Sequence, residues 1–516
     1  MPIVQQGAIN TTALVVPDLY VQIVPPQNLV LNGVPTNVLG VVGTASWGPV
    51  GEPVILATMS DYATNFGPVM ARKYDMGTAI ATAVQQGAAN FRGVRVSDGS
   101  DTAAAFQLPN TNFLFTALYT GSFGNSMTVA MGTGSKAGSW RLTVTLPGVQ
   151  PEVFDNITGS GAAFWTNLAA AVNVGTGVQR GASHIVVCSP GGTSAAPAAF
   201  SWSLSLGSAG NDGAAGATAA TLVGVDTATR RGMYALRGLG CSIGVLADAD
   251  DASQWTTQAA FALQEGVYFV LVGPAGDTIN SAVFAKQSWG IDSYACKLMY
   301  GDWIWWNDQV NQVLRLVSPQ GFVAGRLANL SPEQSSLNKP LYGVVGSQKS
   351  GTPGSGQRTS YSSAELGVLL QAGIDVIANP QPAGSFWGVR GGHNSSSNAA
   401  TNGDNYTRLT NFIAATLSAG MGLFVGQVIN AGLFRRIRAT QLSFLQNMLG
   451  QGLLGSTDGS LPFSVICDLS NNPPSRTGLG YVQSDAQIQY QAINEKFIVN
   501  MEGGQTVQVS RQTLPV

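Results

Sequence analysis

Histidine and cysteine carry much of the acid–base, nucleophilic and metal chemistry of proteins, and this sequence holds few of either. It has two histidines, His184 and His393, and four cysteines that lie dozens of residues apart, Cys188, Cys241, Cys296 and Cys467. No two cysteines form a CxxC pair, so we expect neither structural zinc nor a disulfide framework. Buried, reduced thiols are the simpler interpretation. We predict no metal site and no cofactor.

One serine lies in a segment that resembles the nucleophile region of subtilisin-like peptidases, Gly192-Thr193-Ser194-Ala195-Ala196-Pro197. A serine nucleophile needs a histidine base within hydrogen-bond reach and a carboxylate that orients this base. The only upstream histidine, His184, precedes an apolar run typical of a strand, and the family's Asp-Thr/Ser-Gly motif is absent. His393 comes downstream of the serine, in the wrong chain order. We therefore expect an ordinary loop here and predict that the protein is not an enzyme.

Nucleotide binding also lacks its sequence pattern. A P-loop needs Gly-Lys-Ser/Thr so that backbone amides and a lysine surround the phosphates, and no lysine in this chain follows a glycine. Gly238-Leu239-Gly240 precedes a predicted strand instead of following one, so it is not a dinucleotide fingerprint. These are ordinary turn glycines.

An acidic cluster and a tryptophan cluster each have two interpretations. Asp248, Asp250 and Asp251 could hold a divalent cation, or they could cap the helix predicted from about residue 254, which we favour. The run Trp303-Ile304-Trp305-Trp306 could form a sugar platform, but aromatic core or a subunit contact is the better interpretation.

Three arginines, Arg435, Arg436 and Arg438, lie close together on a predicted helix over residues 431–449. Arg435 and Arg438 are three residues apart and share a helix face. They could pair with acidic residues of a partner or form a solvated face.

The composition points away from several classes of protein. Charged residues make up 10% of the 516 residues, against about 25% in ordinary soluble domains. The net charge of −2 gives no electrostatic footprint for nucleic acid. No apolar run reaches the roughly 18 residues of a membrane span, and no signal peptide is visible. We predict no nucleic acid partner and no membrane insertion. A subunit whose surface is largely hidden in an assembly would have this composition, and so would a weakly charged, glycine-rich β protein.

Hydrophobic periodicity divides the chain into parts, which predicts a multidomain α+β protein. Strands at 38–43, 54–57, 92–96, 242–247, 267–272 and 294–300 alternate with helices at 75–90, 254–265 and 278–287. Between them lie half-buried strands such as 140–146 and 202–206, with a helix over 162–172. Helices at 364–372, 406–419 and 431–449 follow, and then strands at 463–468, 486–492, 495–500 and 505–512. The predicted domains are an N-terminal linker arm (1–30), a discontinuous α/β middle domain (31–98 and 219–346), an inserted outer β-rich domain (99–218), an inner α+β C-terminal domain (347–500) and a C-terminal arm strand (501–516).

Both ends of the chain are predicted to dock on neighbouring molecules. Residues 13–16 and 19–24 are β-prone and bounded by prolines, which favours an edge strand or an extended segment with no core of its own. The predicted contact residues of the two arms are Leu14, Val15, Val16, Leu19, Tyr20, Val21, Ile23, Thr506, Val507, Gln508, Val509 and Ser510.

Several segments together, in order along nearly the whole chain, resemble the tail sheath proteins of contractile bacteriophages. Val16-Pro17-Asp18-Leu19-Tyr20-Val21-Gln22 is similar to the PGVYVQE arm of that family, and residues 38–67 follow its strand, GPxxEP turn, strand and helix. Gly210-Asn211-Asp212-Gly213, Ser318 to Gly325 and Trp387-Gly388-Val389-Arg390 resemble its GGxDG, PPSGxVAG and WGAR segments. Gly391-Gly392 departs from the usual Thr-Leu after WGAR.

The resemblance implies a structural protein of the virion. It implies a middle domain that is subtilisin-like in fold but non-catalytic, with a β-sandwich inserted into it. Sheath subunits form stacked hexameric rings around a tail tube, and contraction drives the tube through the host envelope. The implied partners are further copies of the chain, the tail tube protein and the baseplate and tail terminator proteins, with assembly in the cytoplasm of the host bacterium. We expect Arg435, Arg436 and Arg438 to face the tube.

Other functions remain open at this stage. The chain could be the sheath of a phage-tail-like bacteriocin or of another contractile injection system. A subtilisin-like serine peptidase and a carbohydrate-binding β protein are remote alternatives, and the first would be revealed by fluorophosphonate labelling of Ser194.

Overall fold

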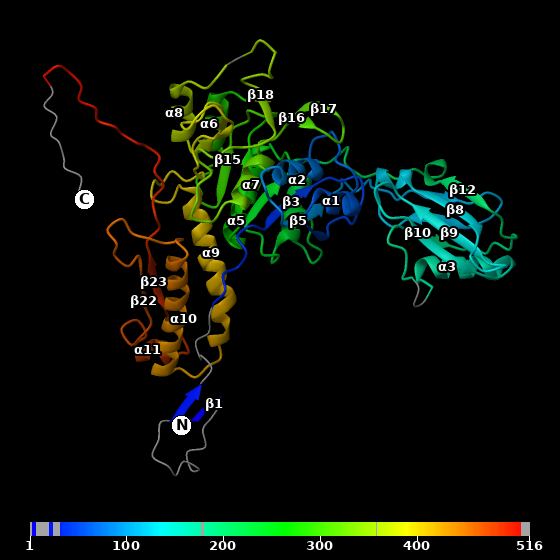
Figure 1. The fold of residues 1–516 in the computed structure, drawn as a ribbon, viewed down its shortest axis with the longest axis horizontal. Coiled ribbons are helices and arrows are strands. Elements are labelled where there is room, and N and C mark those ends of the chain that lie inside the picture. Colours follow the sequence, from blue (N-terminus) through cyan, green and yellow to red (C-terminus); the bar gives the residue numbers. More distant parts are fainter. Residues whose placement is uncertain (1–2, 7–19, 24–30, 177–179, 358, 507–516) are drawn as a thin grey trace.

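The computed structural model describes residues 3–6, 20–23, 31–176, 180–357 and 359–506. Figure 1 shows a helix-flanked sheet in the middle, a β-rich part to one side and a part with two long helices below. The chain is therefore a mixed α and β protein with several sheets, as the sequence predicts.

A seven-stranded sheet forms the central part, and the chain contributes to it both before and after the inserted region. All neighbouring strands are parallel except β4, which pairs antiparallel with β5. In sheet order the strands are β19 (Ile374–Asp375), β15 (Cys296–Met299), β14 (Tyr268–Val272), β13 (Ile243–Leu246), β3 (Leu39–Gly43), β5 (Phe91–Arg95) and β4 (Pro53–Leu56). Every residue of β13 and β14 is buried, which explains their uninterrupted apolar sequences.

Helices pack around this sheet, and two of them touch closely. They are α1 (Met59–Phe66), α2 (Met76–Val84), α4 (Ala219–Val223), α5 (Trp255–Glu265), α6 (Ile279–Ser288), α7 (Gln320–Asn329) and α8 (Ser363–Gln371). Gly321 and Gly325 put the backbone of α7 against α2, where a Cβ on Gly325 would lie 2.5 Å from the Cα of Ala83. A three-stranded antiparallel sheet lies beside them, β17 (Val313–Val317), β16 (Ile304–Asp308) and β18 (Val344–Ser347).

The inserted region holds two antiparallel sheets and one helix, α3 (Gly161–Asn173). One sheet has the order β10 (Glu152–Ile157), β9 (Trp140–Thr145), β8 (Thr128–Thr133) and β12 (Phe200–Ser203). The other has the order β11 (Val186–Ser189), β7 (Leu114–Ala117) and β6 (Ala105–Gln107). The strand predicted over 202–206 ends at Ser203, because the Ser203 hydroxyl accepts from the backbone N–H of Ser205 and starts a 3-10 turn.

A buried arginine joins the inserted region to the central sheet. The Arg95 guanidinium, fully buried at the end of β5, donates to the backbone carbonyls of Gly48 (2.6 Å), Thr120 (2.7 Å) and Asp212 (3.1 Å). Trp47 extends into the core of the inserted region and packs edge-on against Tyr119. Side chains of both parts therefore share one interface.

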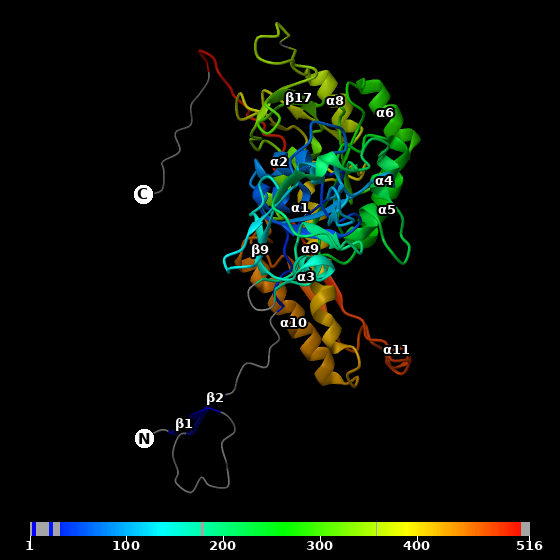
Figure 2. The same cartoon turned by 90° about the vertical axis from the view of Figure 1, so that its right-hand side faces the viewer.

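The C-terminal part is built on two long helices, α9 (Asp404–Met421) and α10 (Ala431–Gly450), which lie side by side in both views (Figures 1 and 2). Strands β22 (Phe463–Ile466) and β23 (Asp485–Ile488) form an antiparallel pair, with α11 (Pro474–Thr477) between them. The short strands β20 (Ile377–Ala378) and β21 (Gly388–Val389) also pair. At the other end of the chain, β1 (Ile3–Gln6) pairs in parallel with β2 (Tyr20–Ile23), apart from the folded body.

One feature differs from the sequence predictions. No strand covers the described residues after β23, so the strand predicted over 495–500 is absent; a strand needs a partner, and this stretch has no ladder to join. Strand β19 and Leu369 of α8, which follow residue 347, belong to the central sheet and its core. The domain boundaries stay a prediction. Among the described residues, none of the helices combines the length and apolar character that a membrane crossing needs.

Candidate assembly surfaces

The three arginines predicted to face a partner all lie exposed on α10, whose first turn is capped by the Asn430 side chain. Among the described residues, Arg435 hydrogen-bonds only within its own helix, to the carbonyl of Ala431. Arg436 donates to the Gln427 side chain (2.8 Å), and Arg438 donates to the carbonyl of Val465 in β22 (3.0 Å). Within the described residues none of the three makes an ion pair. Hydrogen bonds from Ser470 lower the pKa of the Asp468 carboxyl, and Arg438 lies near enough to add to this effect, so Arg435 and Arg436 are the charges most available to an anionic surface.

The turn between α9 and α10 adds apolar surface beside these arginines. Val425 and Val428 are 84% and 80% exposed, and Leu423 is exposed as well. Exposed side chains of this size, grouped on one turn, are typical of an interaction site.

The predicted arm residues are only partly covered by the structure. Tyr20, Val21 and Ile23 belong to β2, and Thr506 lies in a turn. Leu14, Val15, Val16, Leu19, Val507, Gln508, Val509 and Ser510 lie outside the described residues. Before them, Phe497, Ile498, Val499 and Met501 are 70% to 89% exposed. Met501 is the first residue of the predicted C-terminal arm and the other three precede it, so this apolar stretch extends the candidate arm surface toward the body.

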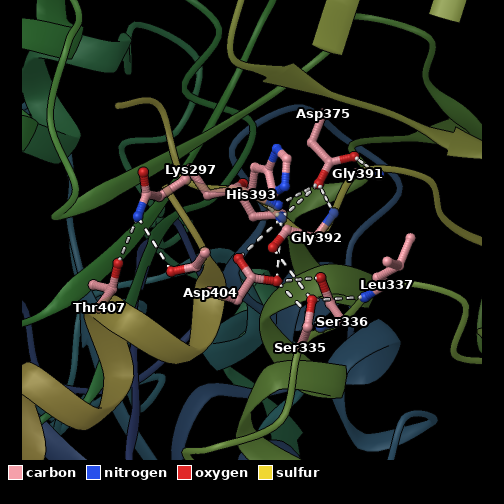
Figure 3. Close-up of polar contacts among 12 residues, drawn as sticks. Lys297, Ser335, Ser336, Leu337, Asp375, Gly391, Gly392, His393, Asp404 and Thr407 are labelled. Atoms are coloured by element: carbon pink, nitrogen blue, oxygen red, sulfur yellow. Dashed lines mark hydrogen bonds and ion pairs between the residues drawn. The ribbon is translucent and has the colours of Figure 1, made fainter. Parts of the chain in front are cut away.

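A buried ion triad fixes α9 to the central sheet (Figure 3). Lys297 of β15 donates to Asp375 (2.6 Å) and to Asp404 (3.1 Å), the first residue of α9, and all three side chains are almost completely buried. We call Lys297, Asp375 and Asp404 the α9 anchor. Backbone N–H groups of Gly391 and Gly392 donate to Asp375, while Ser336 and Tyr268 donate to Asp404. Every charge in the anchor is thus hydrogen-bonded, as buried charges require.

The electrostatics of the anchor favour its charged form. Burial would raise the pKa of Asp404, but the Lys297 ammonium and the hydroxyls of Ser336 and Tyr268 outweigh it and lower that pKa. Burial would likewise lower the pKa of Lys297, but the two carboxylates raise it. Arg408, one turn further along α9, is also buried and donates to the carbonyls of Ser331 and Leu330.

Sequence reasoning missed the α9 anchor because its members are far apart in the chain. Asp375 and Asp404 follow Lys297 by 78 and 107 residues. The available signal was a lysine inside an otherwise apolar buried strand, Cys296-Lys297-Leu298-Met299. The departure at Gly391-Gly392 now has a reason, because Gly392 has φ +68° and a Cβ there would lie 2.2 Å from Ser335 Oγ.

The residues considered for catalysis are not assembled into a site. Ser194 lies in the loop between β11 and β12, and no hydrogen bond between described residues joins it to a histidine. His184 is exposed in the inserted region, and His393 instead contacts Glu495.

The other clusters have structural roles. Asp251 accepts from the backbone N–H of Ser253 and caps the turn that leads into α5, as favoured above. Trp303 and Trp306 are buried, which confirms aromatic core. All four cysteines are free and buried, and burial raises the pKa of Cys241 and of Cys296 to about 12.

Comparisons with known proteins identify the fold. No protein-family model matches this sequence, and no curated protein matches it. Among solved structures, a sheath tail protein of Listeria innocua is similar with a TM-score of 0.59 and 15% identity, over 85% of this chain and 90% of its own. One from Desulfitobacterium hafniense is similar with a TM-score of 0.56 and 15% identity, over 86% and 92%.

A sheath from an extracellular contractile injection system, PVC in its contracted state, is also similar. Its TM-score is 0.54 at 12% identity, over 96% of this chain and 99% of its own. At sequence identities of 12% to 15%, the similarity establishes a shared fold and nothing more. This chain therefore has, over most of its length, the fold of the sheath proteins of contractile tails and contractile injection systems.

Proposed function

We propose that this protein is the structural subunit of a contractile tail sheath. It polymerises as stacked hexameric rings around a tail tube and contracts by subunit rearrangement, which drives the tube through the host envelope. The observation that carries the proposal is the extent of the likeness, which spans 85% to 96% of this chain and at least 90% of each sheath neighbour. A shared domain in an unrelated protein would leave much of one chain unmatched.

The likeness supports a finer description of the central part. Six parallel strands with one antiparallel edge strand, flanked by helices, are compatible with the subtilisin-like fold expected from the resemblance. The two sheets of the inserted region are compatible with the expected β-sandwich. With no assembled catalytic group among the described residues, the role we assign to this fold is structural.

The arms are proposed to connect neighbouring subunits by β-augmentation, in which an extended segment adds a strand to an exposed sheet edge. The β22–β23 sheet has only two strands in the described chain, so each strand has an edge that can accept another. The exposed apolar residues 497–501 supply a segment that would gain from such pairing. Because these contacts join different patches, they propagate into a helical polymer.

In the proposed sheath, the C-terminal part of each subunit lines the inner surface, which faces the tail tube. Arg435, Arg436 and Arg438 would face an acidic or polar tail tube protein, because all three are exposed and none makes an ion pair among the described residues. The baseplate and the tail terminator are the proposed partners at the two ends of the polymer. The particle would be assembled in the host bacterial cytoplasm and then form part of the virion.

One observation favours a second candidate of the same class. A sheath of an injection system matches 96% of this chain, a larger share than the tail sheath proteins cover. The chain is then the sheath of a phage-tail-like bacteriocin or another contractile injection system. The mechanism is the same in both cases: contraction takes its free energy from new subunit interfaces rather than from nucleotide hydrolysis.

Negative-stain electron microscopy of the purified full-length chain, over a range of salt concentrations, tests the proposal. We expect long hollow tubes with a helical repeat. If only single particles form, a tail tube protein is added as a template. Single particles under both conditions would contradict the proposed function.

A further inference from the structure

Residues 489–496, which we call the strap, run from the end of β23 back over the body of the subunit. At its start the backbone N–H of Gln489 donates to the carbonyl of Pro462 (2.7 Å), and the Tyr490 ring lies edge-on to Tyr406 with centroids 5.7 Å apart. Asn405 then donates to the carbonyl of Gln491 (3.0 Å). The first three residues of the strap are thus attached to the C-terminal part.

Beyond these residues the described chain lines a groove on the body but forms a single hydrogen bond to it. From residue 492 to residue 506, the only hydrogen bond among the described residues joins Glu495 to His393, with 2.6 Å between Oε1 and Nε2. Two residues later Phe497 is 82% exposed, and the apolar stretch through Met501 follows. The Glu495 contact therefore lies at the point where the chain leaves the body.

His393 is a rigid attachment point because its backbone belongs to the surroundings of the α9 anchor. Its N–H donates to Asp375 (3.3 Å), and its carbonyl accepts from the Lys297 ammonium (2.9 Å). Figure 3 shows the His393 ring projecting from this buried network. The backbone from which the imidazole extends is thus held in place.

The groove beneath the strap holds charges of both signs. It has a volume of about 830 Å³, and its charged lining besides the pair itself is Glu333, Lys339 and Arg390 from the body and Lys496 from the strap. Behind the His393 backbone lie Lys297, Asp375 and Asp404, whose charges are satisfied within the anchor. An imidazole gains or loses its charge between about pH 5 and 8, and a charged donor makes a stronger hydrogen bond to a carboxylate than a neutral one.

We propose that the His393–Glu495 pair is a pH-sensitive clasp that holds the strap on the body and fixes where the exposed segment from Phe497 begins. With His393 protonated, the clasp is closed and the segment leaves the subunit from one place. With His393 neutral, the strap opens more often beyond Gln491. For assembly, a closed clasp at mildly acidic pH would fix the point at which the C-terminal arm leaves the subunit. This consequence rests on the proposed sheath function, whereas the clasp itself does not.

Limited proteolysis of the full-length chain by proteinase K, with the chain kept as single particles in dilute solution, tests the clasp at pH 5.5 and pH 8.0. Relative to a free peptide of residues 489–501 at the same pH, we expect cleavage within 492–497 to be about two- to fivefold slower at pH 5.5 than at pH 8.0, the size typical of a part-exposed pair. The difference should vanish in His393→Asn and in Glu495→Gln. His184→Asn, which changes the other histidine, should retain it.

Each of the two variants removes one partner of the His393–Glu495 contact. The test can therefore still be made if one of them does not fold. Equal protection at both pH values in the unmodified chain, or a difference that persists in Glu495→Gln, would overturn the clasp. Electron microscopy separates this from the proposed function. Tubes together with pH-independent cleavage of the strap reject only the clasp, and a pH-dependent strap without tubes under any condition rejects only the sheath.

Discussion

Lys297 is the residue on which the attachment of α9 to the sheet depends most. Its removal leaves two buried carboxylates, Asp375 and Asp404, without their cation. Breaking a buried ion pair by deleting one partner typically costs about 3–5 kcal/mol. We therefore expect Lys297→Met to lower the free energy of unfolding by that amount in urea titrations followed by circular dichroism. Lys136→Met, at an exposed position of the inserted region, should change it by less than about 0.5 kcal/mol. A loss below 1 kcal/mol for Lys297→Met would show that the anchor contributes little.

Asp75 should make stability depend on pH in a direction opposite to most carboxylates. Its side chain caps α2 through the backbone N–H of Thr78, but burial raises its pKa to about 7 from an ordinary 3.8. The contribution of Asp75 to stability is therefore fully present below about pH 4, the pKa in the unfolded chain. It is lost as the pH rises from there through about 7, the pKa in the folded protein. One carboxylate oxygen and the nearby Tyr62 hydroxyl have no partner among the described residues. An uncharged cap should therefore suit this site better at high pH.

We predict that Asp75→Asn raises the free energy of unfolding by about 1–4 kcal/mol at pH 8 and by roughly a third of that gain at pH 5, because pH 5 lies only about one unit above the ordinary pKa of 3.8. Asparagine is an equally good helix cap, so the bond to Thr78 is retained. Asp98→Asn is the control, and we expect it to lower the free energy of unfolding at pH 8 instead of raising it. Hydrogen bonds from Ser100 and Gly216 lower the pKa of the exposed Asp98 carboxyl, so its charged form is the one that is stabilised. Thermal unfolding at the two pH values measures both. A destabilised Asp75→Asn protein at pH 8 would show that the charge is needed.

At the scale of elements, the contact between α2 and α7 requires a residue without a side chain. A Cβ on Gly325 would lie 2.5 Å from the Cα of Ala83, so the two helices would have to separate. Alanine normally favours a helix over glycine by about 1 kcal/mol, but overpacking costs about 1–3 kcal/mol. We expect Gly325→Ala to be destabilising in urea unfolding. Gly367→Ala in α8, where no atom lies within 4 Å of the added carbon, should be neutral or stabilising. Equal effects of the two substitutions would contradict the close contact.

Elements could be predicted from the sequence where local pattern and tertiary environment agree. The run Val267–Val272 predicts a buried strand, and β14 covers Tyr268–Val272 with every residue buried. The segment 495–500 has a β-prone centre, Phe497-Ile498-Val499, but forms no strand, because a strand also needs a partner edge that the pattern cannot supply. The arginines of α10 could be found because they are adjacent in sequence. The α9 anchor and the His393–Glu495 pair could not, because only folding brings such distant residues together.

At the scale of the whole molecule, the interfaces within the subunit are polar and buried, whereas the proposed interfaces between subunits are exposed. Arg95 joins the inserted region to the sheet, and the α9 anchor joins the sheet to the helices. Both interfaces favour a subunit that moves as one body. Separating the parts at either interface would expose a buried charge or leave it without its partner. A polymer of such bodies can change its arrangement only at flexible connections between them. The arms are the segments to which we assign that role.

Deletion of residues 1–24 should therefore abolish polymerisation and leave a folded subunit. About 25 extended residues can reach roughly 80 Å, enough to bridge to a neighbouring subunit, and the polymer loses one of its two proposed strand exchanges without them. The thermal unfolding of the truncated chain should match that of the full chain, because the central sheet and its core begin after this segment. Electron microscopy should then show single particles where the full chain forms tubes, also when tube protein is added. Tubes of normal length from the truncated chain would reject the arm as the connector and leave rigid lateral contacts to hold the polymer together.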